Sequence, residues 1–147
     1  MQNSSVVVDS NLAIYTVVDS DFSLLATRVW THLLSSTVNI FAPGLWAYET
    51  TSVIRKLYSF GKITEGEAQM ALNILDQMPI QLISSDLPLR QAALSWATRL
   101  GQKSAYDSFY MATAEKLEAN LWTADQALAN NAHQAGATWV HWIGEYT

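Results

Sequence analysis

Short apolar runs alternate with longer amphipathic stretches along the whole chain. The run VVV at residues 6–8 is β-branched and has no polar position, which is typical of a strand buried on both faces. Apolar residues three or four positions apart predict an amphipathic helix over residues 21–36. Strands are expected at residues 6–8, 38–41, 80–83, 121–123 and 138–143. Helices are expected at residues 21–36, 43–61, 64–77, 87–100, 104–119 and 125–135.

Residues that start and stop helices support these boundaries. Pro43 suits the first turn of a helix and Gly61 its C-terminal cap. Thr64 and Glu67 have the spacing of a capping box, and Ser104 is expected to open a later helix. Strands that alternate with helices predict an α/β fold with a mostly parallel sheet, and we expect one domain over residues 1–147.

The composition narrows the class of protein. Half of the residues (50%) are apolar and only 14% are charged, a balance that excludes a disordered chain. Cysteine is absent, which excludes disulfides, thiolate zinc sites, iron–sulfur clusters and a cysteine nucleophile. No apolar run approaches the roughly 18 residues of a membrane helix, and the first residues lack the basic start of a secretory signal. We therefore expect a soluble, cytoplasmic protein with no membrane association.

The charge balance is acidic. Eight Lys and Arg face thirteen Asp and Glu, for a net charge of -5. This balance disfavours a nucleic-acid-binding protein that contacts phosphates through a broadly basic surface. An acidic chain can still act on nucleic acid where a few cations line one groove.

Three aspartates lie where a parallel sheet binds ligands, at the carboxyl ends of its strands. Asp9 directly follows the first strand, Asp125 follows the strand at 121–123, and Asp107 lies in the first turn of its helix. Each also has a simpler explanation. Asp9 and Asp125 could be helix N-caps, and Asp107 could complete a cap with Ser104.

Glu49 has no such simple explanation, because it interrupts an apolar stripe. Leu45, Glu49 and Val53 are four residues apart, and Leu57 follows on the same side of the helix. A carboxylate buried without a partner is costly, so a functional role is favoured over a position at the edge of the stripe that reaches water.

If Asp9, Glu49, Asp107 and Asp125 converge, four like charges share one site. They would repel one another unless they were protonated or neutralised by a cation. A site made only of oxygen ligands favours Mg²⁺ or Mn²⁺ over zinc. Clusters of this kind are suited to phosphodiester hydrolysis by metal-activated water.

With these residues in place, the chain resembles PIN-domain ribonucleases, in particular VapC-like toxins. The opening VVVDSN is similar to the first strand of the family and its aspartate, here Asp9. The segment APGLWAYETTSVIRKLYSFGKIT resembles the helix that carries the family's glutamate, here Glu49. The segment LGQKSAYDSFYMATAEKLEANLWTADQALAN resembles the block that carries the third and fourth acids, here Asp107 and Asp125.

The resemblance implies a three-layer α/β/α sandwich and an endoribonuclease that depends on Mg²⁺ or Mn²⁺. It implies that the four acids are catalytic and hold the metal, with Ser10, Asn11 and Thr123 as supporting residues. It further implies the toxin component of a type II toxin–antitoxin pair, with an RNA substrate, a cognate antitoxin and a homodimeric state. The apolar helices at 21–36 and 43–77 are the candidate interfaces.

Few cations are available to hold RNA in such a protein. The candidates are Arg55, Lys56 and Lys62, with Lys103 as a further one. Among the aromatic residues, Trp46 or Tyr106 could stack a base because each is close in sequence to a candidate acid, although packing in the core is the simpler expectation.

Two other functions remain open on the sequence. The first is a catalytically silent PIN-like module that binds proteins, which the presence of all four acids disfavours. The second is an acidic-pocket α/β protein, either a receiver or a phosphatase, because Asp19-Ser20-Asp21 resembles a phosphatase nucleophile motif. The following residues do not fit that motif, so Asp19 and Asp21 are expected in a solvated loop and N-cap. His32, His133 and His141 are dispersed, and we expect surface or core roles for them.

Overall fold

The centre of the molecule is a five-stranded parallel sheet. A computed structural model describes residues 4–147, with the strands in the order β3-β2-β1-β4-β5. All four strand pairings are parallel, so the expectation of a parallel sheet is confirmed. The strands are β1 (Ser5–Val8), β2 (Asn39–Pro43), β3 (Ile80–Ile83), β4 (Asn120–Thr123) and β5 (Val140–Trp142).

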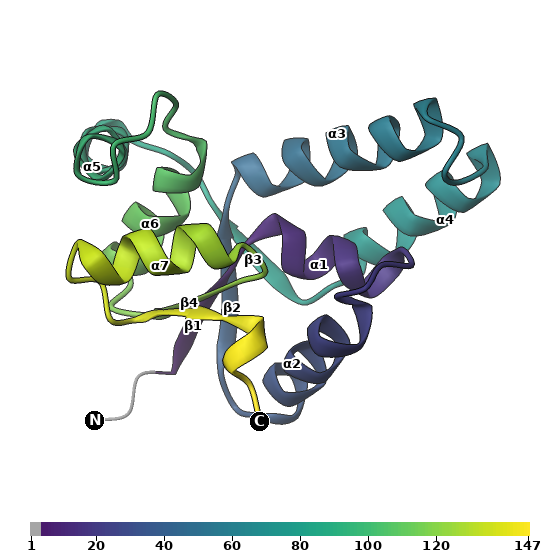
Figure 1. Ribbon diagram of the computed structural model, residues 1–147, viewed down its shortest axis with the longest axis horizontal. Helices are drawn as coiled ribbons and strands as arrows, with labels where there is room; N and C mark the ends of the chain where they lie inside the picture. The colour runs from purple at the N-terminus through teal and green to yellow at the C-terminus, as the bar shows by residue number, and fades with distance from the viewer. Residues whose placement is uncertain (1–3) are drawn as a thin grey trace.

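Helices cover both faces of this sheet, as an α/β/α sandwich requires. Figure 1 shows α6 and α7 on one side of the strands and α2 on the other, while α3 and α4 project together as a hairpin. The helices are α1 (Ser10–Val17), α2 (Ser23–Ser35), α3 (Leu45–Ser59), α4 (Glu65–Asp76), α5 (Leu87–Arg99), α6 (Tyr106–Lys116) and α7 (Gln126–Gln134), followed by the 3₁₀ turn η1 (Ile143–Glu145).

The first strand shows why the sheet is buried on both faces. Val7 belongs to the apolar cluster that α6 and α7 share, whereas Val6 and Val8 belong to the cluster beneath α2. All three valines are buried. Because alternate side chains of a strand point to opposite faces, a strand between two helical layers needs apolar residues at every position.

Most helix ends follow the local signals in the sequence. The Thr64 hydroxyl accepts from the Glu67 amide at 3.1 Å and the Glu67 carboxylate accepts from the Thr64 amide at 2.9 Å, which is the expected capping box. Gly61 adopts a φ of +71° just after α3, in the left-handed region that glycine tolerates. These two residues set the turn between α3 and α4.

Two expected helix starts are wrong. Pro43 is the last residue of β2, and α3 begins at Leu45. Pro43 pairs with Ile83 at the end of the sheet, where a residue without an amide hydrogen is tolerated. Ser104 does not open α6, which begins at Tyr106 with Ala105 as its N-cap.

Helix α1 was not expected from the sequence pattern. Its buried residues Leu12, Ala13 and Ile14 are consecutive and pack into both apolar clusters. A helix wedged between two clusters has no single apolar stripe, so periodicity does not reveal it. None of the helices described combines the length and apolar character that crossing a bilayer requires.

Candidate active site

The order of the strands creates a natural binding position between β1 and β4. The chain passes from β1 outward to β2 and β3, and then returns to place β4 and β5 on the other side. In such sheets the ligand-binding crevice lies at the carboxyl ends of the two strands where the direction reverses. Asp9 directly follows β1 and Asp125 lies two residues after β4, so both acids flank this position.

Asp9 is held rigidly at the end of β1. Its side chain is only 4% exposed. One carboxylate oxygen accepts from the Ser10 amide at 2.7 Å, and the other accepts from the Thr123 hydroxyl at 2.8 Å. The first contact makes Asp9 the N-cap of α1, and the second joins it to β4. Asp9 is therefore both a cap and a buried acid at the strand end.

Thr123 and Asn11 connect the two central strands around Asp9. The Thr123 hydroxyl accepts from the Asp125 amide at 3.0 Å and from the Asn11 side-chain amide at 3.4 Å. The Asn11 side-chain oxygen accepts a hydrogen bond from the Ala124 backbone amide at 2.9 Å. These contacts fix the loop that carries Asp125, while the Asp125 carboxylate caps α7 through the Leu128 amide at 3.0 Å. Thus Asn11 and Thr123 occupy supporting positions beside the acids.

Glu49 reaches the sheet end from the second turn of α3. The residues of the expected stripe are half-buried, whereas the fully buried line of α3 is Trp46, Thr50 and Ile54. Glu49 accepts a 2.6 Å hydrogen bond from the hydroxyl of Tyr110, which is completely buried in α6. The carboxylate therefore has a partner, although not on its own helix.

Asp107 is positioned by the loop that precedes its helix. Its carboxylate accepts from the Gln102 side chain at 3.2 Å, and the Gln102 oxygen accepts from the Ser108 hydroxyl at 3.3 Å. The hydrogen bond of Asp107 runs to Gln102, which differs from the cap with Ser104 that the sequence also allowed. Gln102 and Tyr110 were not expected as site residues. Tyr110 has a sequence signal, since it lies one helical turn after Asp107, whereas Gln102 has none.

The four acids (Asp9, Glu49, Asp107 and Asp125, called the acidic cluster below) interact electrostatically. The pKa of Asp9 is raised from 3.8 to about 7, mainly by burial and also by the charges of Asp107 and Glu49, against the opposing Thr123 hydrogen bond. Burial likewise raises the pKa of Glu49, and Asp107 adds to that effect. Burial and the charge of Asp125 raise the pKa of Asp107. Carboxylates from separate segments therefore affect one another in pairs, and Asp107 takes part in most of these pairs.

Tyr110 remains a proton donor within this group. Burial raises the pKa of its hydroxyl, and the neighbouring carboxylates of Asp9 and Glu49 raise it further. The hydroxyl can therefore hold Glu49 across the whole range of physiological pH.

The chemistry of the cluster fits a hard divalent cation. Burial and like charges both disfavour its ionised form, and a cation would relieve both effects. Within residues 4–147, no three acidic or histidine side chains are grouped closely enough to enclose an ion by themselves. Mg²⁺ does not require such a cage, because it keeps several waters and binds through one or two carboxylates. Asp9, Glu49, Asp107 and Asp125 are the residues that could hold it.

The basic candidates lie at increasing distances along α3. Lys56 is seven residues after Glu49, which places it on the same side of the helix about 10 Å away along the axis. Arg55 points to another side, where its guanidinium lies 5.3 Å from the centre of the Tyr58 ring. Lys62 lies in the turn after α3, and exposed Lys103 precedes Asp107 by four residues. Lys103 is thus the candidate nearest in the chain to an acid, while Lys56 is the candidate on the same side of α3 as Glu49.

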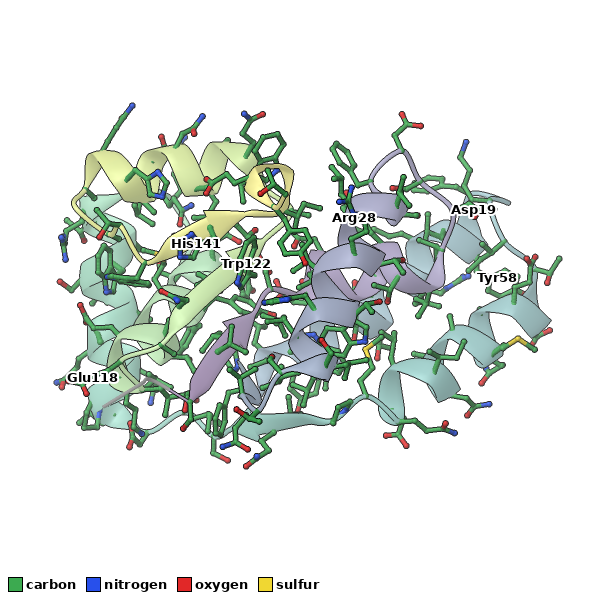
Figure 2. The ribbon with its side chains drawn as sticks, turned by 90° about the horizontal axis from the view of Figure 1, so that it is seen from below. Asp19, Arg28, Tyr58, Glu118, Trp122 and His141 are labelled. Atoms are coloured by element: carbon green, nitrogen blue, oxygen red, sulfur yellow. The ribbon has the colours of Figure 1, made fainter. Side chains whose placement is uncertain are left out.

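The remaining candidates lie elsewhere. Trp46 is buried in the core, as the simpler expectation had it, but Tyr106 is 60% exposed, so for Tyr106 that expectation is wrong. Asp19 and Asp21 are in an exposed loop, and Figure 2 shows Asp19 in the same half of the molecule as Tyr58, away from Trp122. Asp19 follows a helix and no strand, unlike a phosphatase nucleophile, and the N-cap of α2 is Phe22.

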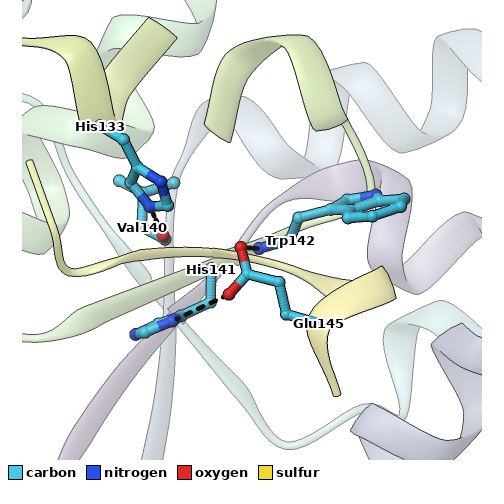
Figure 3. A network of polar contacts seen from close by, with 5 residues as sticks. All are labelled: His133, Val140, His141, Trp142 and Glu145. Atoms are coloured by element: carbon cyan, nitrogen blue, oxygen red, sulfur yellow. Dashed lines mark hydrogen bonds and ion pairs between the residues drawn. The ribbon is translucent and has the colours of Figure 1, made fainter. Parts of the chain in front are cut away.

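The histidines have structural contacts. Figure 3 shows the His133 ring at the Val140 carbonyl, 2.5 Å apart, which ties α7 to β5. In the same view His141 faces Glu145, with 3.8 Å between Nδ1 and Oε2. The His32 ring packs against Tyr146 at 5.5 Å. These surface and packing roles agree with the expectation.

Comparison with known proteins places this geometry in a family. A family model for the PIN domain matches residues 6–134. The fold is similar to that of Mycobacterium tuberculosis VapC20, whose crystal structure is described as that of a sarcin–ricin loop cleaving toxin. The TM-score is 0.63 at 16% identity, covering 85% of this chain and 94% of VapC20. A search of curated proteins found no match. The chain therefore belongs to the PIN-domain family, with the VapC fold that its sequence resembles.

Proposed function

We propose that the chain is a metal-dependent endoribonuclease and the toxin component of a type II toxin–antitoxin pair, acting in the cytoplasm as a single domain. The observation that supports this proposal is the set of pairwise electrostatic effects among acids of separate segments near the sheet's switch point: Asp107 and Glu49 act on Asp9, and Asp125 acts on Asp107. Membership of the PIN-domain family and the fold shared with a toxin that cleaves RNA support the same conclusion.

The acids have different tasks in this proposal. Mg²⁺ or Mn²⁺, when bound by the acidic cluster, supplies the positive charge and the water activation that phosphodiester hydrolysis needs. Asp9 offers a rigid, buried ligand, since both of its oxygens are already oriented by Ser10 and Thr123. Glu49, whose pKa is raised by burial, can take up a proton near the reacting group, and Tyr110 holds it in position.

RNA would approach from the side where cations are available. Lys56 lies about 10 Å along α3 from Glu49, a separation that one or two nucleotides can span. Lys103 lies beside the first turn of α6. Arg55 and Lys62 extend the basic positions toward the end of α3. With so few cations, binding should be weak and its salt dependence shallow, because the salt slope grows with the number of phosphates that the protein neutralises.

Exposed apolar side chains on α2 and the α3–α4 hairpin suggest protein partners. Leu24 and Leu34 are exposed on α2. On the hairpin, Phe60, Met70 and Ile74 are exposed. Apolar surface of this kind marks contacts with other proteins, and we assign it to a homodimer and to the cognate antitoxin.

The test is RNA cleavage by purified protein with Mn²⁺ or Mg²⁺. We expect cleavage that stops on chelation and in Asp107→Asn, because a weakened metal site loses the main stabiliser of transition-state charge. The matched control is Asp76→Asn, which removes an exposed carboxylate on α4 and should leave the rate unchanged.

Two results would overturn the proposal. If a wide panel of RNAs stays intact with either ion, the protein is a binding module. If a small phosphate ester is hydrolysed and Asp19→Asn abolishes that activity, the protein is a phosphatase and the acidic cluster is not its centre.

A further inference from the structure

One cavity is lined by the residues that directly precede Glu49 and Asp107 in the chain. It has a volume of about 480 Å³, within the range of roughly 300–1,000 Å³ typical of small-molecule sites. It lies between the start of α3, the start of α6 and the loop after β3. We call it the tyrosine cavity; its main side chains are Leu45, Tyr48, Ser84, Ser85, Tyr106 and Phe109.

The tyrosine cavity is joined to the acids through the same helix turns. Tyr48 immediately precedes Glu49 on α3, and Tyr106 immediately precedes Asp107 on α6. The hydrogen bond from Tyr110 to Glu49 spans these two helices at 2.6 Å. The cavity and two of the four acids therefore belong to the same turns of α3 and α6.

Both tyrosines expose an unusual amount of ring. Tyr48 is 77% exposed and Tyr106 is 60% exposed, although each belongs to a well-formed helix. In the part of the chain that the structure describes, neither ring stacks on another ring or on a cation. Their flat faces are available to a ligand.

The lining of the cavity selects the kind of ligand. None of the described residues that line it carries a charge, so it offers little to a phosphate. Aromatic faces stack on nucleobases of any sequence, and the Ser84 and Ser85 hydroxyls can both donate and accept hydrogen bonds at base edges. A base is therefore a better fit than a phosphate or a charged peptide.

We propose that the tyrosine cavity holds the nucleobase of a nucleotide next to the scissile phosphate, stacked on Tyr48 and Tyr106. This inference rests on the proposed ribonuclease function and extends it to the substrate. A base inside the cavity cannot be paired or stacked within a helix. The substrate is consequently RNA that is single-stranded at the cut, such as the loop of a folded RNA.

Another cavity borders the acids on the opposite side, near Asp125, with a volume of about 350 Å³. Of its three aromatic residues, Tyr15 and Phe22 already pack on each other, with ring centres 5.4 Å apart, and Trp142 is half-buried. They are less available to a base than Tyr48 and Tyr106, which favours the tyrosine cavity.

The first experiment measures steady-state cleavage of a hairpin RNA and of the same sequence fully paired. Tyr48→Ala and Tyr106→Ala should each raise KM at least about fivefold, which corresponds to the lower end of base–aromatic stacking. Tyr48→Phe and Tyr106→Phe keep the ring and should retain wild-type KM. Leu94→Ala is the control, because Leu94 is similarly exposed (67%) but lies on α5 and does not line the tyrosine cavity.

The second experiment places the fluorescent base analogue 2-aminopurine beside the mapped cleavage position in the RNA. Its fluorescence is followed on addition of the full protein, with Ca²⁺ in place of Mn²⁺ or Mg²⁺. Quenching should occur in the wild type and the Phe variants and disappear in the Ala variants. The inference would be overturned if Tyr48→Ala and Tyr106→Ala kept the wild-type KM and still quenched the fluorescence. It would also be overturned if the fully paired RNA were cleaved as well as the hairpin, or if Phe22→Ala abolished the quenching.

The ribonuclease function and the base-binding role of the tyrosine cavity can be refuted separately. If no RNA is cleaved, the proposed function fails, and the inference fails with it unless quenching still depends on Tyr48 and Tyr106. If RNA is cleaved at wild-type KM by both Ala variants, the ribonuclease stands and the base does not lie in this cavity.

Discussion

Asp9→Asn should make the metal-free protein more stable at alkaline pH, although it removes a buried residue's native charge. The Asp9 carboxyl has a pKa of about 7 in the folded protein, mainly because of burial, against 3.8 for an unperturbed aspartate. Below pH 3.8 both the folded and the unfolded state bind the proton, and Asp9 costs nothing. As the pH rises, the unfolded state releases its proton first, and stability falls until the pH passes the folded pKa.

The magnitude follows from the two pKa values. At about 1.4 kcal/mol per pH unit, the ionised carboxylate destabilises the fold by about 4 kcal/mol above pH 7, and about 2.5 kcal/mol of this develops between pH 5 and pH 8. Asparagine has a single acceptor oxygen for the two donors, Ser10 and Thr123, which costs about 1–2 kcal/mol. The variant should therefore match the wild type near pH 5 and exceed it by roughly 2–3 kcal/mol at pH 8.

The assay is urea unfolding in EDTA at both pH values, followed by tryptophan fluorescence. At pH 8 the midpoint of Asp9→Asn should lie on the order of 1 M urea above that of the wild type. Asp76→Asn, an exposed acid on α4, is the control and should shift little at either pH. If Asp9→Asn were destabilised by the same amount at pH 5 and pH 8, the prediction would be refuted, because the ionised Asp9 carboxylate would then not destabilise the folded protein.

The remaining predictions concern the metal, the RNA and the oligomeric state. Mn²⁺ or Mg²⁺ at about 100 times its Kd should raise the Tm of the wild type by about 5–10 °C and that of Asp9→Asn much less; equal shifts would place the ion elsewhere. Lys56→Ala should weaken RNA binding and lower its salt slope by about 1, with smaller effects for Arg55→Ala and Lys62→Ala, whereas Lys116→Ala, which removes the partner of Asp86, should not. Light scattering should show a dimer that Phe60→Ser or Met70→Ser weakens, and a strict monomer at high concentration would contradict the assigned interface.

The sequence predicts the α/β alternation because most strands and helices carry a complete local signal. The all-valine run of β1 and the capping box at Thr64 and Glu67 are examples in which one segment is sufficient. Helix α1 lacks such a signal, since burial on both sides removes the amphipathic stripe. Pro43 satisfies the rule for a helix start, but its pairing with Ile83 extends β2 instead.

Asp9 and Asp125 were recognisable by their positions after strands and Glu49 as an acid within an apolar stripe, but the environment of the acids was not predictable. Tyr110 holds Glu49 across 61 positions of the chain, and the raised pKa of Asp9 comes mainly from burial, with contributions from Asp107 and Glu49. Such contacts exist only after the segments pack together. The exposure of Tyr106 was also not predictable from the sequence. Tyr110, four residues later on the same helix, is completely buried, whereas Tyr106 is 60% exposed. Sequence therefore indicated which residues to consider, and packing determined what each of them contacts.

The most direct test of the central claim is the position of a bound divalent ion. Crystals grown with Mn²⁺ should show an anomalous scattering peak among the carboxylates of the acidic cluster, and the peak should vanish in Asp9→Asn. A peak at another position, or RNA cleavage that continues in a chelator with no ion at these carboxylates, would contradict the account.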